Sequence, residues 1–269
     1  MNELLSIVLN LISSVIFEIG KKFKLSKNIT ETKKISERLQ YVLELMNEHR
    51  DEKFTVAELS KILKLKKISE LEKYFLNEDE PTFKFLKKFT NEFAINLEWL
   101  TEGKGYPFKC DQHVYIHFFE DCLNRIEELH PEIIYFIRAD SFEGQTCIML
   151  KINDYKFIVL DTYLHFSKQN GHGGTVTLVD FRKLVMTLIL EKRYITKGVI
   201  VSKKVFKDLY QGKVFPYSSL KLKKGIFDYW HDDFTDIYNE RYGYQRHSNY
   251  DQNFIDAFTI VKSYIEKNS

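Results

Sequence analysis

The chain has 269 residues, which is more than one small module needs and suits two compact domains of about 100–200 residues each. Hydrophobic residues make up 44% and charged residues 29%, with only 11 glycines and 4 prolines, which excludes disorder, collagen-like repeats and Gly/Ser tethers. The net charge of +2 excludes a bulk polycation, so a surface that binds nucleic acid has to be a local patch. Three cysteines argue against a disulfide framework and favour a reducing, cytoplasmic compartment.

Residues 1–28 are predicted to form an amphipathic N-terminal helix. Apolar residues between positions 4 and 19 recur at the helical period, and lysines follow them. This apolar run is too short to span a membrane and lacks the preceding positive charge of a secretory signal, so we expect no membrane partner. Packing on its own domain is the favoured role of the helix and self-association the next; attachment to a membrane surface comes last, because the stripe lacks a basic polar face.

Residues 29–108 are predicted to form an all-α domain of five helices. Thr55 opens one helix, with Glu58 at the spacing of a capping box. Thr82 opens another helix, whose apolar residues share one face, and Gly103 marks the end of the block. No strand-like alternation occurs before residue 110.

Several segments of this domain resemble the Cro/phage-repressor family of helix-turn-helix DNA-binding domains. They are residues 55–60 for the supporting helix, 66–75 for the recognition helix, and the closing segments 80–83 and 89–105. The specific part is Trp99-Leu100-x-x-Gly103-x-Gly105, and the resemblance implies that Trp99 and Leu100 are core residues. The family usually has a glycine in the turn, where this chain has Lys64-Leu65.

The resemblance implies that double-stranded DNA is the partner and that the second helix of the motif enters the major groove. Residues 61–73 carry a local net charge of +3, which is a modest phosphate-binding patch. The first turn of the recognition helix is expected to face bases, and lysines further along to lie nearer the phosphates. The expected DNA-binding residues are Thr55, Lys66, Lys67, Ser69, Glu70, Lys73, Lys84, Lys87 and Lys88.

Residues 109–269 are predicted to form a mixed α/β domain for ligand sensing or oligomerisation, so the fold class of the whole chain is α+β. Residues 133–138 and 146–152 are short β-branched and apolar runs, and 155–160 complete a hairpin with the second run. Helical spacing follows in residues 178–188, and Ser202 caps a short helix that ends at Gly212.

The most glycine-dense stretch, residues 170–175, precedes this helical pattern. Backbone N–H groups at a helix start can hold an anion, with Thr175 or Thr177 as the cap, and a plain flexible connection fits equally well. The stretch lacks the lysine of a phosphate-binding P-loop and is not GxGxxG. The candidate ligand-binding residues here are His172, Gly173, Gly174 and Thr175.

Two patterns suggest metal chemistry and are weaker than their structural alternatives. Cys110, His113, His117 and Cys122 have ligand-type side chains, but a strand-like alternation places Cys122 out of reach of the histidines, so we expect no metal and no cofactor. Trp230-His231-Asp232-Asp233-Phe234 gathers an imidazole and two carboxylates, for which Asp154 and Asp161 are further candidates. A helix N-cap flanked by core aromatics is the favoured interpretation of that segment.

The leading hypothesis is a cytoplasmic, bacterial-type, repressor-like transcriptional regulator that is not an enzyme and responds to a small-molecule or protein effector. Alternatives are a nuclease-type effector that uses its C-terminal domain, and a protein-interaction scaffold. Because one small helix-turn-helix makes few contacts, a homodimer is expected on DNA. The apolar stripe of residues 4–19 and the aromatic-rich region 229–258 are the two candidate dimer surfaces.

Overall fold

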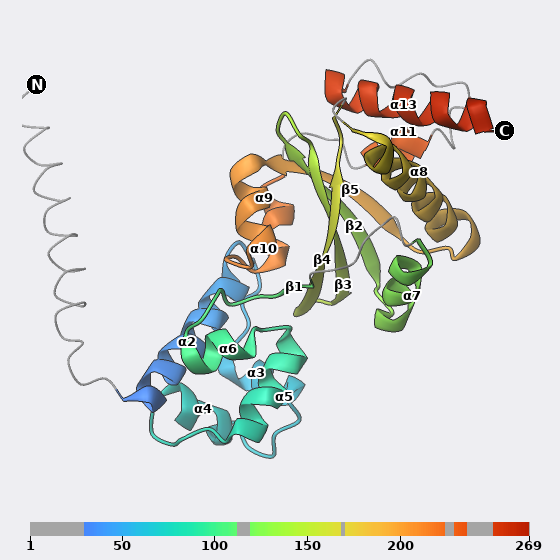
Figure 1. Cartoon of the computed structure of the whole chain (residues 1–269). Helices are drawn as coiled ribbons and strands as arrows, with labels where there is room; N and C mark the ends of the chain where they lie inside the picture. Colours follow the sequence, from blue (N-terminus) through green and yellow to red (C-terminus); the bar gives the residue numbers. More distant parts are fainter. Residues whose placement is uncertain (1–29, 112–118, 168–169, 224–228, 236–249, 269) are drawn as a thin grey trace, which may run out of the picture.

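The computed structural model describes residues 30–111, 119–167, 170–223, 229–235 and 250–268 (Figure 1). The helix expected over residues 1–28, and with it one candidate dimer surface, lies outside these ranges, as do His113 and His117. Within them the protein is a mixed α+β structure, which confirms the fold class at that level.

Residues 30–108, all of which are described, form a helical unit. Thr55 and Glu58 make the predicted capping box, and Thr82 caps its helix as predicted. Gly103 ends the last helix with φ +76°, a conformation that favours glycine. The helices of this unit are α2 (Glu31–Asn47), α3 (Val56–Ile62), α4 (Ser69–Phe75), α5 (Phe83–Phe93) and α6 (Leu97–Glu102).

Trp99 and Leu100 lie in the core of the helical unit, as predicted, with exposed fractions of 9% and 0%. Each helix has an apolar face made by residues spaced three and four positions apart, and this face packs into the core. Burial of these faces stabilises short helices that would be marginally stable alone. The other fully or nearly buried members of the cluster in this unit include Leu39, Val42, Met46, Leu59, Leu63, Leu71, Phe89 and Phe93.

A five-stranded sheet forms the centre of the second half, in the order β1-β4-β3-β2-β5. β3 and β4 form the hairpin predicted from residues 146–160, and β2, the predicted run 133–138, pairs antiparallel with β3, with Phe136 opposite Ile148. β5 pairs with β2 in parallel and β1 pairs with β4 in parallel, and neither strand was predicted. The strand bounds are Cys110–Asp111, Ile133–Asp140, Gln145–Asn153, Lys156–His165 and Thr196–Ser202 for β1 to β5.

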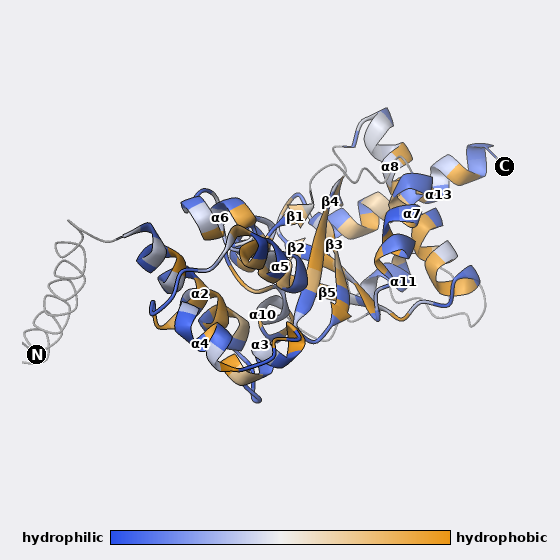
Figure 2. Cartoon of the chain, turned by 90° about the horizontal axis from the view of Figure 1, so that it is seen from below, coloured by the Kyte–Doolittle hydropathy of each residue, from blue (hydrophilic) through white to orange (hydrophobic). Residues whose placement is uncertain are grey.

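Helices cover both faces of the sheet (Figure 1). Alternate residues of β2 point to opposite cores: Ile134 and Phe136 into one, Tyr135 and Ile137 into the other. Figure 2 accordingly shows the strands as mainly hydrophobic. One face carries α7 (Phe119–Leu129), α8 (His172–Met186) with its π-helical extension η2 (Thr187–Glu191), α11 (Trp230–Thr235) and α13 (Gln252–Asn268). The other face carries α9 (Lys203–Tyr210), α10 (Pro216–Lys221) and the helical unit.

The helical unit and the sheet share one continuous buried cluster. The Arg50 guanidinium lies 4.3 Å from the ring centroid of Tyr217, and the Phe108 N–H donates to the Gly212 carbonyl at 3.0 Å. Residue 108 therefore marks the change from helices to sheet without a gap in the core. No helix in the described ranges has both the length and the apolar character that crossing a membrane requires.

The glycine-rich stretch differs from its prediction. α8 already begins at His172, with Gly171 at the N-cap and no side-chain cap. Thr175 and Thr177 lie inside the helix, where their hydroxyls donate to the carbonyls of Gly171 and Gly173 at 3.3 and 2.9 Å. The expected capping role of these threonines is therefore wrong, because the helix starts one turn earlier than the glycines suggested.

The aromatic-rich region 229–258 is one of the two candidate dimer surfaces, and the structure contradicts the expectation that its aromatic side chains are exposed, for most of those that it describes. Trp230, Phe234 and Phe254 are fully buried, whereas Tyr229 is 57% exposed. These rings fill the core between the sheet, α8 and α13. Aromatic side chains bury large areas, so one extra helical layer absorbs them.

Candidate nucleic-acid interface

α3 and α4 are consecutive helices joined by a tight turn. α3 ends at Ile62 with Leu63 as its C-cap, and Lys64 then adopts a left-handed conformation with φ +52°. This conformation reverses the chain so that the Leu65 N–H donates to the Ser60 carbonyl at 3.0 Å. Leu63 and Leu71 are buried in the common core, one from each side of the turn. The angle between the two helices is therefore fixed by core packing and by one non-glycine residue at a position that favours glycine.

The expected recognition helix over residues 66–75 is shorter in the structure. α4 begins at Ser69, so the prediction that Lys66 and Lys67 belong to its first turn is wrong. Both lysines lie in the exposed connection before the helix, because the turn closes at Leu65 and residues 66–68 precede the first residue of α4. Ser69 and Glu70 occupy the first turn and are exposed, as expected.

The lysines assigned to phosphate contacts divide into two groups. Lys73, Lys84 and Lys87 are exposed on α4 and α5. Lys88 instead donates from Nζ to the Leu63 carbonyl at 2.5 Å, so it holds the C-terminus of α3 in place, where a cation also suits the helix dipole. Thr55 is likewise engaged, as the N-cap of α3.

Four lysines surround the turn and are exposed: Lys61, Lys64, Lys66 and Lys67. None of them forms an ion pair with another described residue. Their charges are therefore not neutralised within the part of the chain that the structure describes. At the other end of α4, residues 78–80 are all acidic and exposed. The motif is positive at its turn and negative at the loop that follows it.

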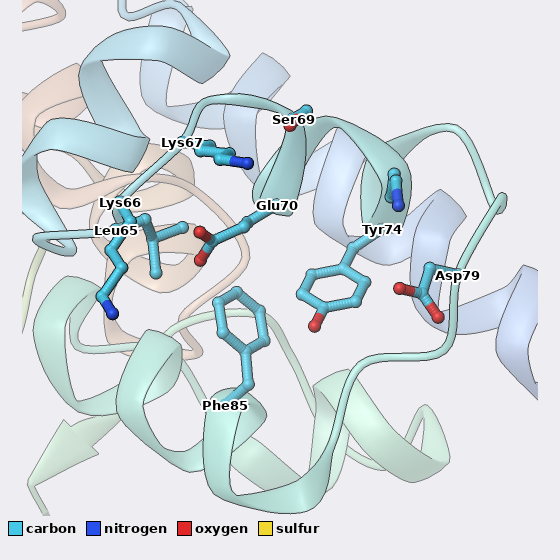
Figure 3. Close-up of a pocket in the computed structure, with 9 residues that line it drawn as sticks. Leu65, Lys66, Lys67, Ser69, Glu70, Tyr74, Asp79 and Phe85 are labelled. Carbon is cyan, nitrogen blue, oxygen red and sulfur yellow. The ribbon is translucent and has the colours of Figure 1, made fainter.

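A hollow of about 480 Å³ separates α4 from the start of α5. Figure 3 shows the Glu70 carboxylate and the Tyr74 and Phe85 rings directed into it. The two rings pack with centroids 4.7 Å apart, and burial together with the charges of Asp79 and Glu70 raises the pKa of Tyr74. The hollow is lined by Leu65, Lys66, Lys67, Ser69, Glu70, Lys73, Tyr74, Asp79 and Phe85.

The other candidate residues are not brought together with this motif. His172 and Gly173 are exposed on the first turn of α8, while Gly174 and Thr175 are half-buried there. His231 and Asp232 are buried on α11, with Nε2 and Oδ1 3.0 Å apart. Across the described ranges, no three His, Cys, Asp or Glu side chains are grouped as a metal site would require.

The sheet domain holds a second cavity that the sequence did not reveal. It lies between the end of β4 and α9 and contains the buried carboxylate of Asp161 and the Tyr210 hydroxyl. Asp161 and Tyr210 are separated by 49 positions in the sequence. They carry no motif, because only the packing of α9 on the sheet brings them together.

Comparison with known proteins gives no relative for this chain: no protein-family model, no curated protein and no solved structure matches it. The function of the chain therefore has to be inferred from its own geometry.

Proposed function

We propose that the protein is a repressor-like, sequence-specific DNA-binding regulator whose helical unit docks α4 in the major groove. The observation that carries the proposal is the ring of exposed, unneutralised lysines around the α3–α4 turn, Lys61, Lys64, Lys66 and Lys67. Phosphate contacts by lysines position such a helix, and side chains of its first turn then reach base edges. Ser69 and Glu70 occupy that first turn, and a glutamate can accept a hydrogen bond from cytosine N4.

The charge distribution supports one orientation of the motif on DNA. The positive turn and the exposed Lys84 and Lys87 of α5 would face the phosphates, and the acidic residues 78–80 would point away from them. The opposite orientation would bring three carboxylates against the DNA backbone, which repels them. Base contacts would therefore come from the N-terminal half of α4 and from the lysines that precede it.

The modest charge of the motif favours a homodimer on DNA. Each phosphate contact changes the slope of log affinity against log salt concentration by about 0.9. Binding that depends on a few lysines is therefore weak at physiological salt. Two copies that bind half-sites about one helical turn apart would restore useful affinity. A cytoplasmic, bacterial-type regulator with an effector-responsive second domain is the complete form of the proposal.

The test begins with selection of bound sequences from a pool of random DNA duplexes, followed by fluorescence anisotropy on the enriched site over a salt series. Lys66→Ala/Lys67→Ala is expected to weaken binding and to lower the salt slope by about one unit for each lost phosphate contact. Lys262→Ala is the matched control, because Lys262 is an exposed lysine on α13, across the sheet from the helical unit. It should bind like the wild type.

Two results would overturn the proposal. One is that selection enriches no sequence. The other is that Lys66→Ala/Lys67→Ala and Lys262→Ala bind duplex DNA equally well at every salt concentration. Circular dichroism of each variant shows whether the fold is kept, and these exposed side chains make no described contact whose loss would unfold the helical unit.

A further inference from the structure

The second cavity has the size and lining of a small-molecule site. Its volume is about 710 Å³, within the range of about 300–1,000 Å³ that ligand pockets occupy. β4 forms one wall with an irregular stretch, in which Thr146 pairs with Leu164 while the next residue, Cys147, pairs with Asp161. At this shift Tyr163 has a left-handed conformation with φ +50° and is 52% exposed. Bulges of this kind redirect side chains and are frequent beside functional sites.

A buried carboxylate with spare acceptor capacity lies in the cavity wall. Asp161 is 2% exposed and accepts hydrogen bonds from the Tyr163 N–H at 3.0 Å and from the Tyr210 hydroxyl. No cation pairs with it among the described residues. A carboxylate has about four lone-pair positions, so each oxygen of Asp161 retains one acceptor site. A partner that presents two adjacent N–H donors would fill both.

The rest of the lining is positive at the rim and aromatic inside. Lys203 and Lys207 are exposed, one helical turn apart on α9, and neither forms an ion pair with a described residue. Phe206 and Tyr210 follow the same face of α9, with their rings stacked at a centroid distance of 6.0 Å. Phe206 is buried beneath this face, and the half-buried Tyr210 and the exposed Tyr163 offer aromatic surface to a planar ligand.

We infer that this cavity binds a nucleotide whose base presents two adjacent N–H donors, as guanine does, with the base on Asp161 and the phosphate at Lys203 and Lys207. A phosphate group carries a charge of about −1.5 to −2 at neutral pH. It therefore matches two lysines better than a ligand carboxylate, which carries one negative charge, would. The inference gives a ligand class to the effector-responsive part of the proposed function. Ligand binding is measured without DNA, so failure of one proposal leaves the other standing.

The experiment is isothermal titration of the full chain with GMP, guanosine and AMP. GMP should bind tightest, because adenine lacks two adjacent N–H donors on one edge and guanosine lacks the phosphate. Hydrogen bonds to a charged group that are lost in a buried site cost at least about tenfold in affinity, so AMP should be weaker by that factor. The affinity for GMP should fall with added salt, and that for guanosine should not.

Variants separate the two ends of the site. Asp161→Asn replaces one acceptor oxygen by a donor and should weaken both GMP and guanosine at least about tenfold. Lys203→Ala/Lys207→Ala should reduce the affinity for GMP to that for guanosine and leave guanosine binding unchanged. Lys204→Ala is the matched control, an exposed neighbour on α9 that does not line the cavity, and it should behave as wild type.

The inference is overturned if GMP does not bind at millimolar concentration, if GMP and AMP bind equally, or if an arginine-type guanidinium ligand displaces GMP and binds tighter. Thermal melting shows whether Asp161→Asn folds. If it does not, the exposed pair Lys203→Ala/Lys207→Ala decides, because loss of both lysines without any change in GMP affinity also overturns the assignment.

Discussion

Lys64 provides a sharp test of how the α3–α4 turn is built. Its φ of +52° places a side chain where L-residues are disfavoured by about 1–2 kcal/mol. Lys64→Gly removes that strain, while the greater freedom of glycine in the unfolded chain costs about 0.5–1 kcal/mol. The variant should therefore be more stable than wild type by about 0.5–1 kcal/mol, or about 1–4 °C in Tm.

Lys64→Ala is the matched control for this prediction, since it removes the same charge and keeps the Cβ atom that causes the strain. It should show no gain in stability in thermal and urea melts. Both variants should lose the same increment of salt dependence in DNA binding, because both lack the ammonium group. If Lys64→Gly is no more stable than Lys64→Ala, the turn does not have the left-handed geometry that joins α3 to α4 in the structure.

Three further predictions concern the core and the junction. Trp99→Ala should cost about 3–5 kcal/mol and unfold the helical unit in a thermal melt, and a wild-type melting curve would contradict its burial. Gly212→Ala should cost about 2–4 kcal/mol by urea titration, because φ is +73° and a Cβ would collide with the Phe108 carbonyl, so a neutral effect would refute that contact. Burial raises the pKa of Cys122 to about 12 and that of Cys147 well above its usual value. Iodoacetamide at pH 8 should therefore label these thiols only after denaturation. Rapid labelling of either thiol in the native protein would contradict the structure.

The features predicted correctly from the sequence are those that local chemistry determines. Thr55 with Glu58 and Thr82 each satisfy backbone N–H groups within four residues, so their caps are visible without the fold. The β3–β4 hairpin follows from two short apolar runs joined by a turn at Asn153 and Asp154. Burial of Trp99 also agrees with the resemblance that placed it in the core.

The errors arise where tertiary packing overrides local pattern. β5 contains Gly198, which weakens a strand on its own, but a Cβ there would collide with Trp230 and crowd His231, so glycine is what lets α11 pack on the sheet. The start of α8 was placed too late because glycines resemble a loop. The Asp161–Tyr210 cavity could not be predicted, because its residues meet only after α9 packs against β4.

Both candidate sites lie on one side of the sheet and share its core. α9 lines the cavity and is followed by Gly212, whose carbonyl accepts from the Phe108 N–H, and Phe108 in turn bridges to Ile95 beside α6. Phe206 of α9 and Phe108 belong to the same buried cluster as the helices of the motif. Close-packed interiors transmit strain, so a ligand that displaces α9 would strain the core that α9 shares with the helical unit. α8, α11 and α13 pack on the opposite face in a separate cluster, so control of the proposed DNA-binding motif by the cavity would run through α9.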